Sequence, residues 1–222
     1  MNDGKYDVIV VGGGHAGCEA AQASARMGCS TLLVTMNLDN IGLMSCNPAV
    51  GGLAKGQLVK EIDALGGEMA RVTDRCALQY RRLNTRKGPA VQATRAQVDR
   101  QQYRLLMKKR LEGCSRLHLR QATVKDIIVD GDSVSGIETD LAEVFSARRI
   151  IITPGTFLNG IIHIGLNHFP GGRLGDFASG ELSGSLQKLG FRIGRFKTGT
   201  CPRLDGKTID FSQMEIQEGD KN

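Results

Sequence analysis

The sequence predicts an α/β fold that has a parallel sheet, crossover helices and a β-meander. Three observations support this prediction. An apolar run over 6–11 ends in a glycine-rich turn and an alanine-rich helical segment, a second apolar run covers 30–35, and short strand patterns separated by turn residues fill 117–144. The 222 residues, of which 41% are hydrophobic and 29 are glycine, suit one domain or slightly more.

The first turn contains the residues that a dinucleotide requires. The strand Tyr6–Val11 leads into Gly12-Gly13-Gly14-His15-Ala16-Gly17, and a helix is expected over 18–27. Gly12 permits a tight turn, Gly14 lets the backbone approach a pyrophosphate, and Gly17 lets the helix pack closely on the strand. The phosphates would meet the positive N-terminal end of that helix. A glycine turn without a ligand is the alternative, but the flanking strand and helix favour the dinucleotide.

The choice between NAD and FAD depends on two later segments. After the second strand, Thr35-Met36-Asn37-Leu38-Asp39 offers no clear acid for a ribose, and Asn37 or Asp39 could serve the ribose or cap a loop. Further on, a hairpin turn at 129–133 and a buried strand at 149–152 lead to Thr153-Pro154-Gly155. This order is typical of flavoproteins and predicts a Rossmann-like FAD/NAD(P)-binding domain of the glutathione-reductase type. Helices are also expected over 57–65, about 95–111 and 180–189.

Cys46 lies in a glycine-rich loop, 44–56, that precedes a helix and could lie against a flavin. A helix N-terminus and Lys55 nearby would favour its thiolate; a buried, inert thiol is the alternative. The other cysteines are at 18, 29, 76, 114 and 201, and no C-x-x-C pair or zinc-ligand spacing occurs. This pattern argues against a metal site, and it indicates a reducing compartment. A flavin disulfide reductase is disfavoured because only Cys46 is expected at the flavin.

The chain has a net charge of +6 and a pI near 9.1, and many of its basic residues lie in one segment. Residues 75–111 contain eleven Lys or Arg residues and one acid, Asp99. A solvated helix face would explain this charge, but so would a polyanionic partner such as RNA. No apolar run is long enough to span a membrane, and the N-terminus does not read as a signal peptide, so we expect a cytoplasmic protein.

Seven sequence motifs occur in a fixed order along the chain. They are Gly-Gly-Gly-His-Ala-Gly at 12–17, Ser-Cys-Asn-Pro-Ala-Val-Gly-Gly at 45–52, Arg-Leu-Asn at 82–84, Lys-Gly-Pro-Ala-Val at 87–91, Arg-Ala-Gln-Val-Asp at 95–99, Pro-Gly-Thr-Phe-Leu-Asn-Gly at 154–160 and Lys-Thr-Gly-Thr at 197–200. This set of motifs resembles the MnmG (GidA) family of bacterial tRNA uridine 5-carboxymethylaminomethyl modification enzymes. The resemblance covers nearly all of the chain.

The resemblance implies an FAD-dependent enzyme that works with the GTPase MnmE. Such enzymes add a (carboxymethyl)aminomethyl group to C5 of the wobble uridine of certain tRNAs. Methylenetetrahydrofolate supplies the carbon, glycine or ammonium supplies the amine, and NADH reduces the flavin. The resemblance also implies a homodimer and, with MnmE, a heterotetramer.

The resemblance also assigns site residues. FAD would contact the turn Gly12, Gly13, Gly14, His15, Ala16 and Gly17, and also Val124 and Ser179. Cys46 would be the catalytic thiol, with no metal. Candidates for tRNA phosphates are Lys87, Arg95, Lys197 and Arg203, although Arg95 could equally pair with backbone carbonyls or Asp99. Cys201, in a Thr-Cys-Pro-Arg turn, is not expected to replace the second cysteine of the family.

Two alternatives stay open: a folate- and FAD-dependent tRNA uridine methyltransferase, and a non-catalytic FAD- or RNA-binding module. Family members are longer than this chain. We therefore expect 1–200 to be the N-terminal part of the FAD-binding domain, without its return segment, and 201–222 to begin an inserted second domain. By itself, such a piece is expected to be inactive.

Overall fold

The computed structural model describes residues 4–221, which fall into two compact units. The first unit contains the chain up to Leu43 and the segment Arg104–Gly194. The second unit contains Met44–Tyr103 and the chain from Arg195 onward. The domain boundary expected at residue 200 stays a prediction, and the compact units have different limits.

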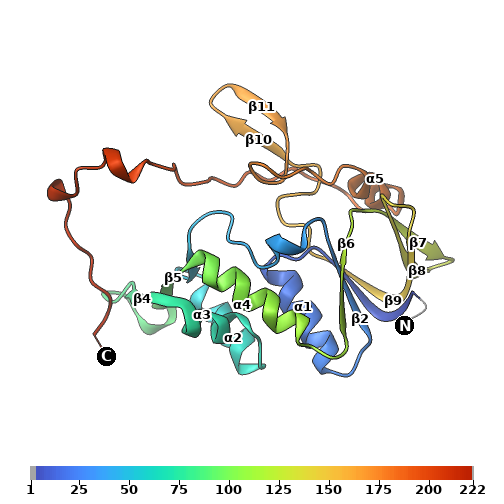
Figure 1. The fold of residues 1–222 in the computed structure, drawn as a ribbon, viewed down its shortest axis with the longest axis horizontal. Coiled ribbons are helices and arrows are strands. Elements are labelled where there is room, and N and C mark those ends of the chain that lie inside the picture. Colours follow the sequence, from blue (N-terminus) through green and yellow to red (C-terminus); the bar gives the residue numbers. More distant parts are fainter. Residues whose placement is uncertain (1–3, 222) are drawn as a thin grey trace. The chain divides into compact units, whose positions relative to one another are not determined.

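The first unit is built on a sheet with the strand order β6-β2-β1-β9-β8-β7 (Figure 1). Strands β6, β2, β1 and β9 are parallel, and β9, β8 and β7 are antiparallel. Helix α1 packs on β1 and β2, and α5 packs on β7. The predicted α/β fold with a parallel sheet, a crossover helix and a meander is confirmed. The bounds are β1 (Lys5–Val11), α1 (His15–Arg26), β2 (Thr31–Thr35), β6 (Leu117–Gln121), β7 (Val124–Asp130), β8 (Ser133–Thr139), β9 (Val144–Ile152) and α5 (Glu181–Lys188).

An apolar cluster on this sheet forms the core of the first unit. Ile9 of β1, Leu32 of β2 and Ile137 of β8 are almost completely buried, and Leu182 of α5 joins them. Burial of a side chain of this size stabilises the fold by about 1.5–3 kcal/mol. The core therefore includes side chains from both the parallel and the antiparallel strands of the sheet.

The structure corrects two details of the expected meander. Leu117–Gln121 is the parallel edge strand beside β2, with Leu33 opposite Leu119. The strand expected at 149–152 is the end of the longer β9, and Ile151 there is 36% exposed. The hairpin turn is confirmed, since Asp130 pairs with Ser133 and Gly131 adopts φ +58°. A second hairpin, β10 (Ile161–Ile164) with β11 (Asn167–Pro170), was not predicted.

The second unit contains a three-stranded antiparallel sheet in the order β3-β5-β4. The strands are β3 (Ala49–Gly51), β4 (Ala77–Leu83) and β5 (Ala93–Val98), and the helices are α2 (Gly56–Ala64) and α3 (Met69–Cys76). Helix α2 confirms the helix expected over 57–65. The chain near its C-terminal end runs along β4, where the Asp220 backbone N–H donates to the Tyr80 carbonyl at 2.9 Å.

The helix expected over 95–111 begins later than predicted, as α4 (Arg100–Glu112). Residues 93–98 instead form β5, the central strand, which pairs with β3 and β4 on its two sides. Asp99 ends the strand and caps the helix, because its carboxylate accepts from the backbone N–H groups of Gln101 at 2.9 Å and Gln102 at 3.0 Å. Strand partners distant in sequence override the local helical pattern. Across residues 4–221, no helix combines the length and apolar character needed to cross a membrane.

Candidate functional site: a glycine turn and a cysteine loop

The glycine turn between β1 and α1 leaves no room for side chains at its two ends. Gly12 has φ +104°, and a Cβ built on it would lie 2.3 Å from the Thr153 carbonyl oxygen. A Cβ on Gly17 would lie 1.8 Å from the carbonyl oxygen of Gly12. A Cβ on Gly14, in contrast, would meet no atom within 4 Å. The turn is therefore closed on the protein side and open at Gly14, which fits the approach of a pyrophosphate.

Thr153 holds this turn from the end of β9. Its hydroxyl lies 2.9 Å from the Val11 carbonyl oxygen and 3.1 Å from that of Gly12, and its backbone N–H donates to Val11 at 2.8 Å. The sequence marked Thr153-Pro154-Gly155 as the end of a strand, but it did not predict that Thr153 fastens the glycine turn. The contact arises because β9 is the parallel neighbour of β1.

His15 and Ala16 form the first turn of α1, directly after Gly14. Burial lowers the pKa of His15, so its imidazole stays neutral at physiological pH. The positive N-terminal end of α1 also disfavours a cation, so it acts on the pKa of His15 in the same direction as burial. Backbone N–H groups of this turn are thus the groups that a phosphate would meet.

Hydrogen bonds of neighbouring residues connect Val124 and Ser179 to the carboxyl ends of the parallel strands. Val124 begins β7 just after Ala122, whose N–H donates to the carbonyl of Thr35 at 3.0 Å at the end of β2. Ser179 precedes α5, and its N–H donates to the Phe157 carbonyl at 2.8 Å. The Phe157 N–H in turn donates to Pro154 at 3.0 Å, beside Thr153. Both residues are buried. Their roles as FAD contacts stay predictions.

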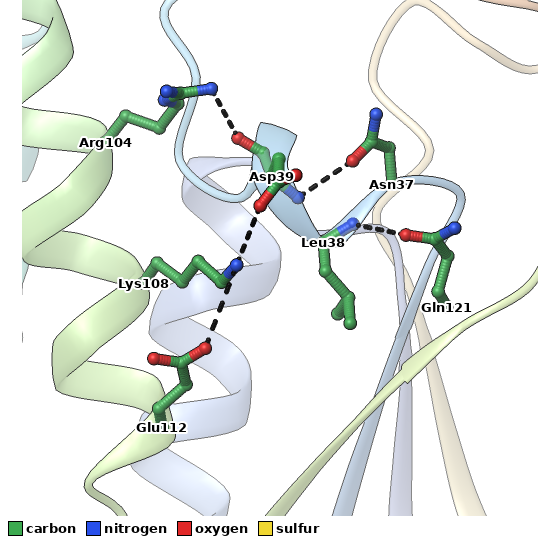
Figure 2. A network of polar contacts seen from close by, with 7 residues as sticks. All are labelled: Asn37, Leu38, Asp39, Arg104, Lys108, Glu112 and Gln121. Atoms are coloured by element: carbon green, nitrogen blue, oxygen red, sulfur yellow. Dashed lines mark hydrogen bonds and ion pairs between the residues drawn. The ribbon is translucent and has the colours of Figure 1, made fainter.

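Asn37 and Asp39, the candidates for a ribose contact, both have structural partners (Figure 2). The Asn37 side-chain oxygen accepts from the Asp39 N–H at 2.8 Å and caps the short 3₁₀ helix Leu38–Asn40. The Asp39 carboxylate accepts from Lys108 Nζ at 2.8 Å, and Arg104 donates to the Asp39 carbonyl at 2.8 Å. These contacts confirm a capping role for Asn37, whereas the Asp39 carboxylate forms an ion pair with Lys108 and does not cap the loop.

In the second unit, the loop that contains Cys46 is held by the segment around Cys201. The two Sγ atoms lie 3.9 Å apart, and the Cys201 thiol also lies 3.0 Å from Asn47 Oδ1, to which it donates. Arg203 donates from Nη2 to the carbonyl of Cys46 at 2.6 Å and to that of Ser45 at 3.3 Å. Four residues thus form one small cluster around Cys46.

This cluster lowers the pKa of the Cys46 thiol. The Cys201 backbone N–H has the largest effect, burial partly opposes it, and the Cys201 thiol, the Asn47 N–H and the charge of Arg203 lower the pKa further. The single proton of the Cys201 thiol cannot serve both Asn47 and Cys46, so the contribution of that thiol depends on which way it points. The prediction of a favoured thiolate had the right direction, but Lys55 is not among its causes.

The position of Cys201 corrects the expectation that only one cysteine lies at this site. Cys201 is 155 residues from Cys46 in sequence, and its side chain is exposed. By contrast, Cys18 and Cys76 are buried and donate to backbone carbonyls of Gly13 and Val72. The two thiols at positions 46 and 201 are therefore both accessible and adjacent.

The basic candidates occupy different parts of the second unit. Lys87 is exposed in the loop between β4 and β5, which is ordered by a 2.8 Å hydrogen bond from the Gln92 side chain to the Lys87 carbonyl. Arg95 is half-buried on β5 and lies directly opposite Arg81 of β4. Two like charges opposite each other destabilise a sheet unless an anion lies nearby. The Asp99 carboxylate, suggested as a partner of Arg95, instead caps α4.

Lys197 and Arg203 lie in the irregular segment before the C-terminal end. Lys197 is exposed. The guanidinium of Arg203 holds the Cys46 loop, which gives it a structural role that the sequence did not indicate. Contact of these four residues with tRNA stays a prediction. Within residues 4–221, no group of three or more His, Cys, Asp or Glu side chains is arranged to hold a metal ion.

The fold and the glycine turn place the chain in the class of proteins with a Rossmann-like FAD/NAD(P)-binding fold. A family model described as glucose inhibited division protein A matches residues 7–222. The chain belongs to this family, which is also called GidA, and the resemblance predicted from its motifs is confirmed.

Individual relatives agree with this assignment. The chain is 62% identical over 98% of its length to the tRNA uridine 5-carboxymethylaminomethyl modification enzyme MnmG of Geotalea uraniireducens. The solved structure of Aquifex aeolicus GidA matches 99% of the chain with a TM-score of 0.95 and 51% identity. The chain spans 35% of the length of the Geotalea relative and 36% of the Aquifex chain. A GidA-related protein of Thermus thermophilus, at 24% identity and a TM-score of 0.62, shares the fold.

Proposed function

We propose that the protein to which this sequence belongs is an FAD-dependent tRNA modification enzyme. It adds an aminomethyl or carboxymethylaminomethyl group to C5 of the wobble uridine, together with the GTPase MnmE. The observation that carries this proposal is the 62% identity to an MnmG enzyme over 98% of the chain, which includes both the glycine turn and the Cys46 loop.

The glycine turn supports FAD as the bound dinucleotide. Gly12, Gly13, Gly14, His15, Ala16 and Gly17 would surround the pyrophosphate, where the open side of Gly14 admits it and the N-terminal end of α1 favours its charge. Val124 and Ser179 would contact other parts of the cofactor. When bound, the flavin supplies hydride transfer, with NADH as its reductant.

Cys46 supports a covalent role for the protein in the proposed reaction. Its thiolate would add to C6 of the uridine, and the electron pair displaced from the C5–C6 double bond would make C5 nucleophilic. C5 would then attack the one-carbon unit derived from methylenetetrahydrofolate. Loss of the C5 proton and expulsion of the Cys46 thiolate would restore the double bond. Glycine or ammonium would provide the amine.

The basic side chains of the second unit support binding of a polyanion. Lys87, Arg95, Lys197 and Arg203 would contact tRNA phosphates, and Arg81, directly opposite Arg95, would add a fifth charge. The partners in this proposal are tRNA, MnmE in a heterotetramer, and a second copy of the protein in a homodimer. The cytoplasm is the compartment where all of these are found.

The test uses the protein expressed from its complete gene, with purified MnmE, undermodified tRNA, methylenetetrahydrofolate, NADH and glycine. Nucleosides from the digested tRNA are analysed by mass spectrometry, and FAD binding is measured from its absorbance. We expect FAD binding and a modified wobble uridine, and no modification with Cys46→Ser. A 5-methyluridine product would instead indicate the methyltransferase. FAD or tRNA binding with no product would indicate a binding module, and normal modification by Cys46→Ser would refute the role of Cys46.

A further inference from the structure

Cys46 and Cys201 are adjacent thiols on two segments that are far apart in the sequence, with sulfurs 3.9 Å apart. We propose that they form a reversible intramolecular disulfide and are thus an oxidation site of this protein. The proposal concerns the thiols themselves and does not depend on the tRNA-modifying function.

The backbone around Cys201 can supply the movement that a bond requires. Bonded sulfurs are about 2 Å apart, so the two atoms must approach by roughly the same amount. Residues 191–205 form no helix or strand, and Cys201 is exposed. Rotation of an exposed side chain on irregular backbone can close such a gap without breaking a ladder of hydrogen bonds.

The surroundings of Cys46 favour reaction at its sulfur. Arg203 brings a positive charge to the loop by donating to the Cys46 carbonyl at 2.6 Å. Cys46 is only half-buried, so a small reagent can reach it. Accessible thiols with a stabilised thiolate are the ones that attack disulfides.

Cys18 provides a contrast within the same chain. Its thiol is buried and donates to the Gly13 carbonyl at 3.4 Å, and burial raises its pKa to about 12. A thiol in this state reacts slowly. Oxidation is therefore expected to select position 46 over position 18.

The oxidant can be a small disulfide such as oxidised glutathione. The Cys46 thiolate attacks one sulfur of the small disulfide, which forms a mixed disulfide and releases one small thiolate. The Cys201 thiol then loses its proton to solvent and attacks Cys46 Sγ, which forms the protein disulfide and releases the second small thiolate. The protein dithiol loses two electrons, and one small disulfide becomes two small thiols.

The bond would also have a functional consequence, which rests on the proposed function. A sulfur bonded to Cys201 cannot add to a uridine. Oxidation would therefore switch off the modification reaction, and a reducing thiol would restore it. The chemical test below is independent of activity, so a failure of the proposed function and a failure of this inference can be told apart.

The experiment incubates the reduced protein, expressed from its complete gene, in glutathione buffers of increasing oxidised fraction. After alkylation of remaining thiols, digestion with trypsin and Asp-N isolates Cys46 in a peptide of residues 39–55, separate from Cys29, and Cys201 in a peptide of residues 198–203. We expect the two peptides to appear linked, to increase with the oxidised fraction, and to separate on reduction.

Two variants sharpen the result. With Cys201→Ser, the linked peptide should disappear and Cys46 should accumulate as a mixed disulfide with glutathione, because the resolving thiol is gone. Cys114→Ser, which changes a half-buried thiol outside this pair, should leave the linked peptide unchanged. Circular dichroism checks that each variant is folded. The inference is overturned if the wild type shows only mixed disulfides at Cys46, or if Cys46 links to another cysteine.

Discussion

The hydroxyl of Thr153 donates to the carbonyl oxygen of Gly12 at 3.1 Å, across 141 residues of sequence. This contact joins the end of β9 to the turn between β1 and α1. The sequence marks these two segments separately, but this contact makes them one structural element at the carboxyl ends of the parallel strands β1 and β9.

Removal of this hydroxyl should weaken the turn. Thr153→Val keeps the shape of the side chain but leaves the carbonyls of Val11 and Gly12 without the hydroxyl, and we expect a loss of about 1–2 kcal/mol in the free energy of unfolding. FAD affinity should fall as well. Thr153→Ser keeps the hydroxyl and serves as the control. Urea unfolding gives the stability, and equal stability of the two variants would contradict the role of the hydroxyl.

Substitutions in the glycine turn should separate folding from cofactor binding. Gly12→Ala places a Cβ 2.3 Å from the Thr153 carbonyl oxygen at φ +104°, so we expect a loss of at least about 1–3 kcal/mol and no flavin binding. Gly14→Ala meets no protein atom within 4 Å, so the protein should fold normally but bind FAD more weakly. The two properties are measured by thermal unfolding and by flavin absorbance.

A matched control for both glycine variants is Gly184→Ala. Gly184 lies inside α5, and a Cβ there also meets nothing within 4 Å. Alanine favours a helix over glycine by about 0.5–1 kcal/mol, so this variant should be slightly more stable and bind FAD normally. If Gly14→Ala binds FAD as well as Gly184→Ala does, the assignment of Gly14 to the pyrophosphate is wrong.

The ion pair between Asp39 and Lys108 should be visible in their titrations. The hydrogen bond with Lys108 and its charge lower the pKa of Asp39, and the bond with Asp39 raises the pKa of Lys108. The contribution of Asp39 to stability is present above the ordinary pKa of aspartate and is lost as the pH falls through the lowered value. That of Lys108 is lost as the pH rises through its raised value.

NMR titration of the Asp39 carboxyl carbon measures this pKa directly. Lys108→Met should return it toward the ordinary value, whereas Lys109→Met, on the neighbouring position of α4, should leave it lowered. Because the pair is exposed, added salt should reduce the shift. A pKa that is insensitive to Lys108→Met would show that another group causes the shift.

Arg81 and Arg95, which lie opposite each other, should contribute to binding of an anion and not to the stability of the fold. Arg95→Gln removes one of two like charges in register, so stability should not fall. If Arg95 contacts a phosphate, tRNA binding should weaken and its slope against salt should decrease by about one. Arg149→Gln, which changes an exposed arginine of β9, is the control. A large loss of stability in Arg95→Gln would instead indicate a structural role.

Arg203 should control the reactivity of Cys46. We expect Arg203→Gln to move the midpoint of Cys46 alkylation to higher pH, because it removes a charge that lowers the pKa of the thiol and frees the Ser45 and Cys46 carbonyls. Lys55→Gln should have no such effect. Alkylation rates at different pH values are measured on the peptide of residues 39–55, which becomes 39–60 in Lys55→Gln because that variant lacks the tryptic site at 55. The reverse order of effects would favour Lys55, as the sequence first indicated.

The sequence by itself determined the features that depend on neighbouring residues. Local patterns predict three features that the structure contains. These are the strand–glycine turn–helix unit over 5–26, the helix α2 and the hairpin at Gly131. The motifs around Gly12 and Cys46 also sufficed to identify the family. These signals are local because backbone conformation and helix packing at a glycine depend on residues only a few positions away.

Tertiary structure alone decided the contacts that join distant segments. Residues 95–98 read as part of a helix but form a strand, because β3 and β4 satisfy the backbone hydrogen bonds of β5. The sequence places Cys201 in a turn with no indicated link to Cys46. In the structure the two Sγ atoms lie 3.9 Å apart, although the residues are 155 positions apart in the sequence. No local pattern carries such information, since the pairing depends on where the folded chain brings each segment. For this reason the sequence predicted the glycine turn well, and it missed both Thr153 behind that turn and the second thiol beside Cys46.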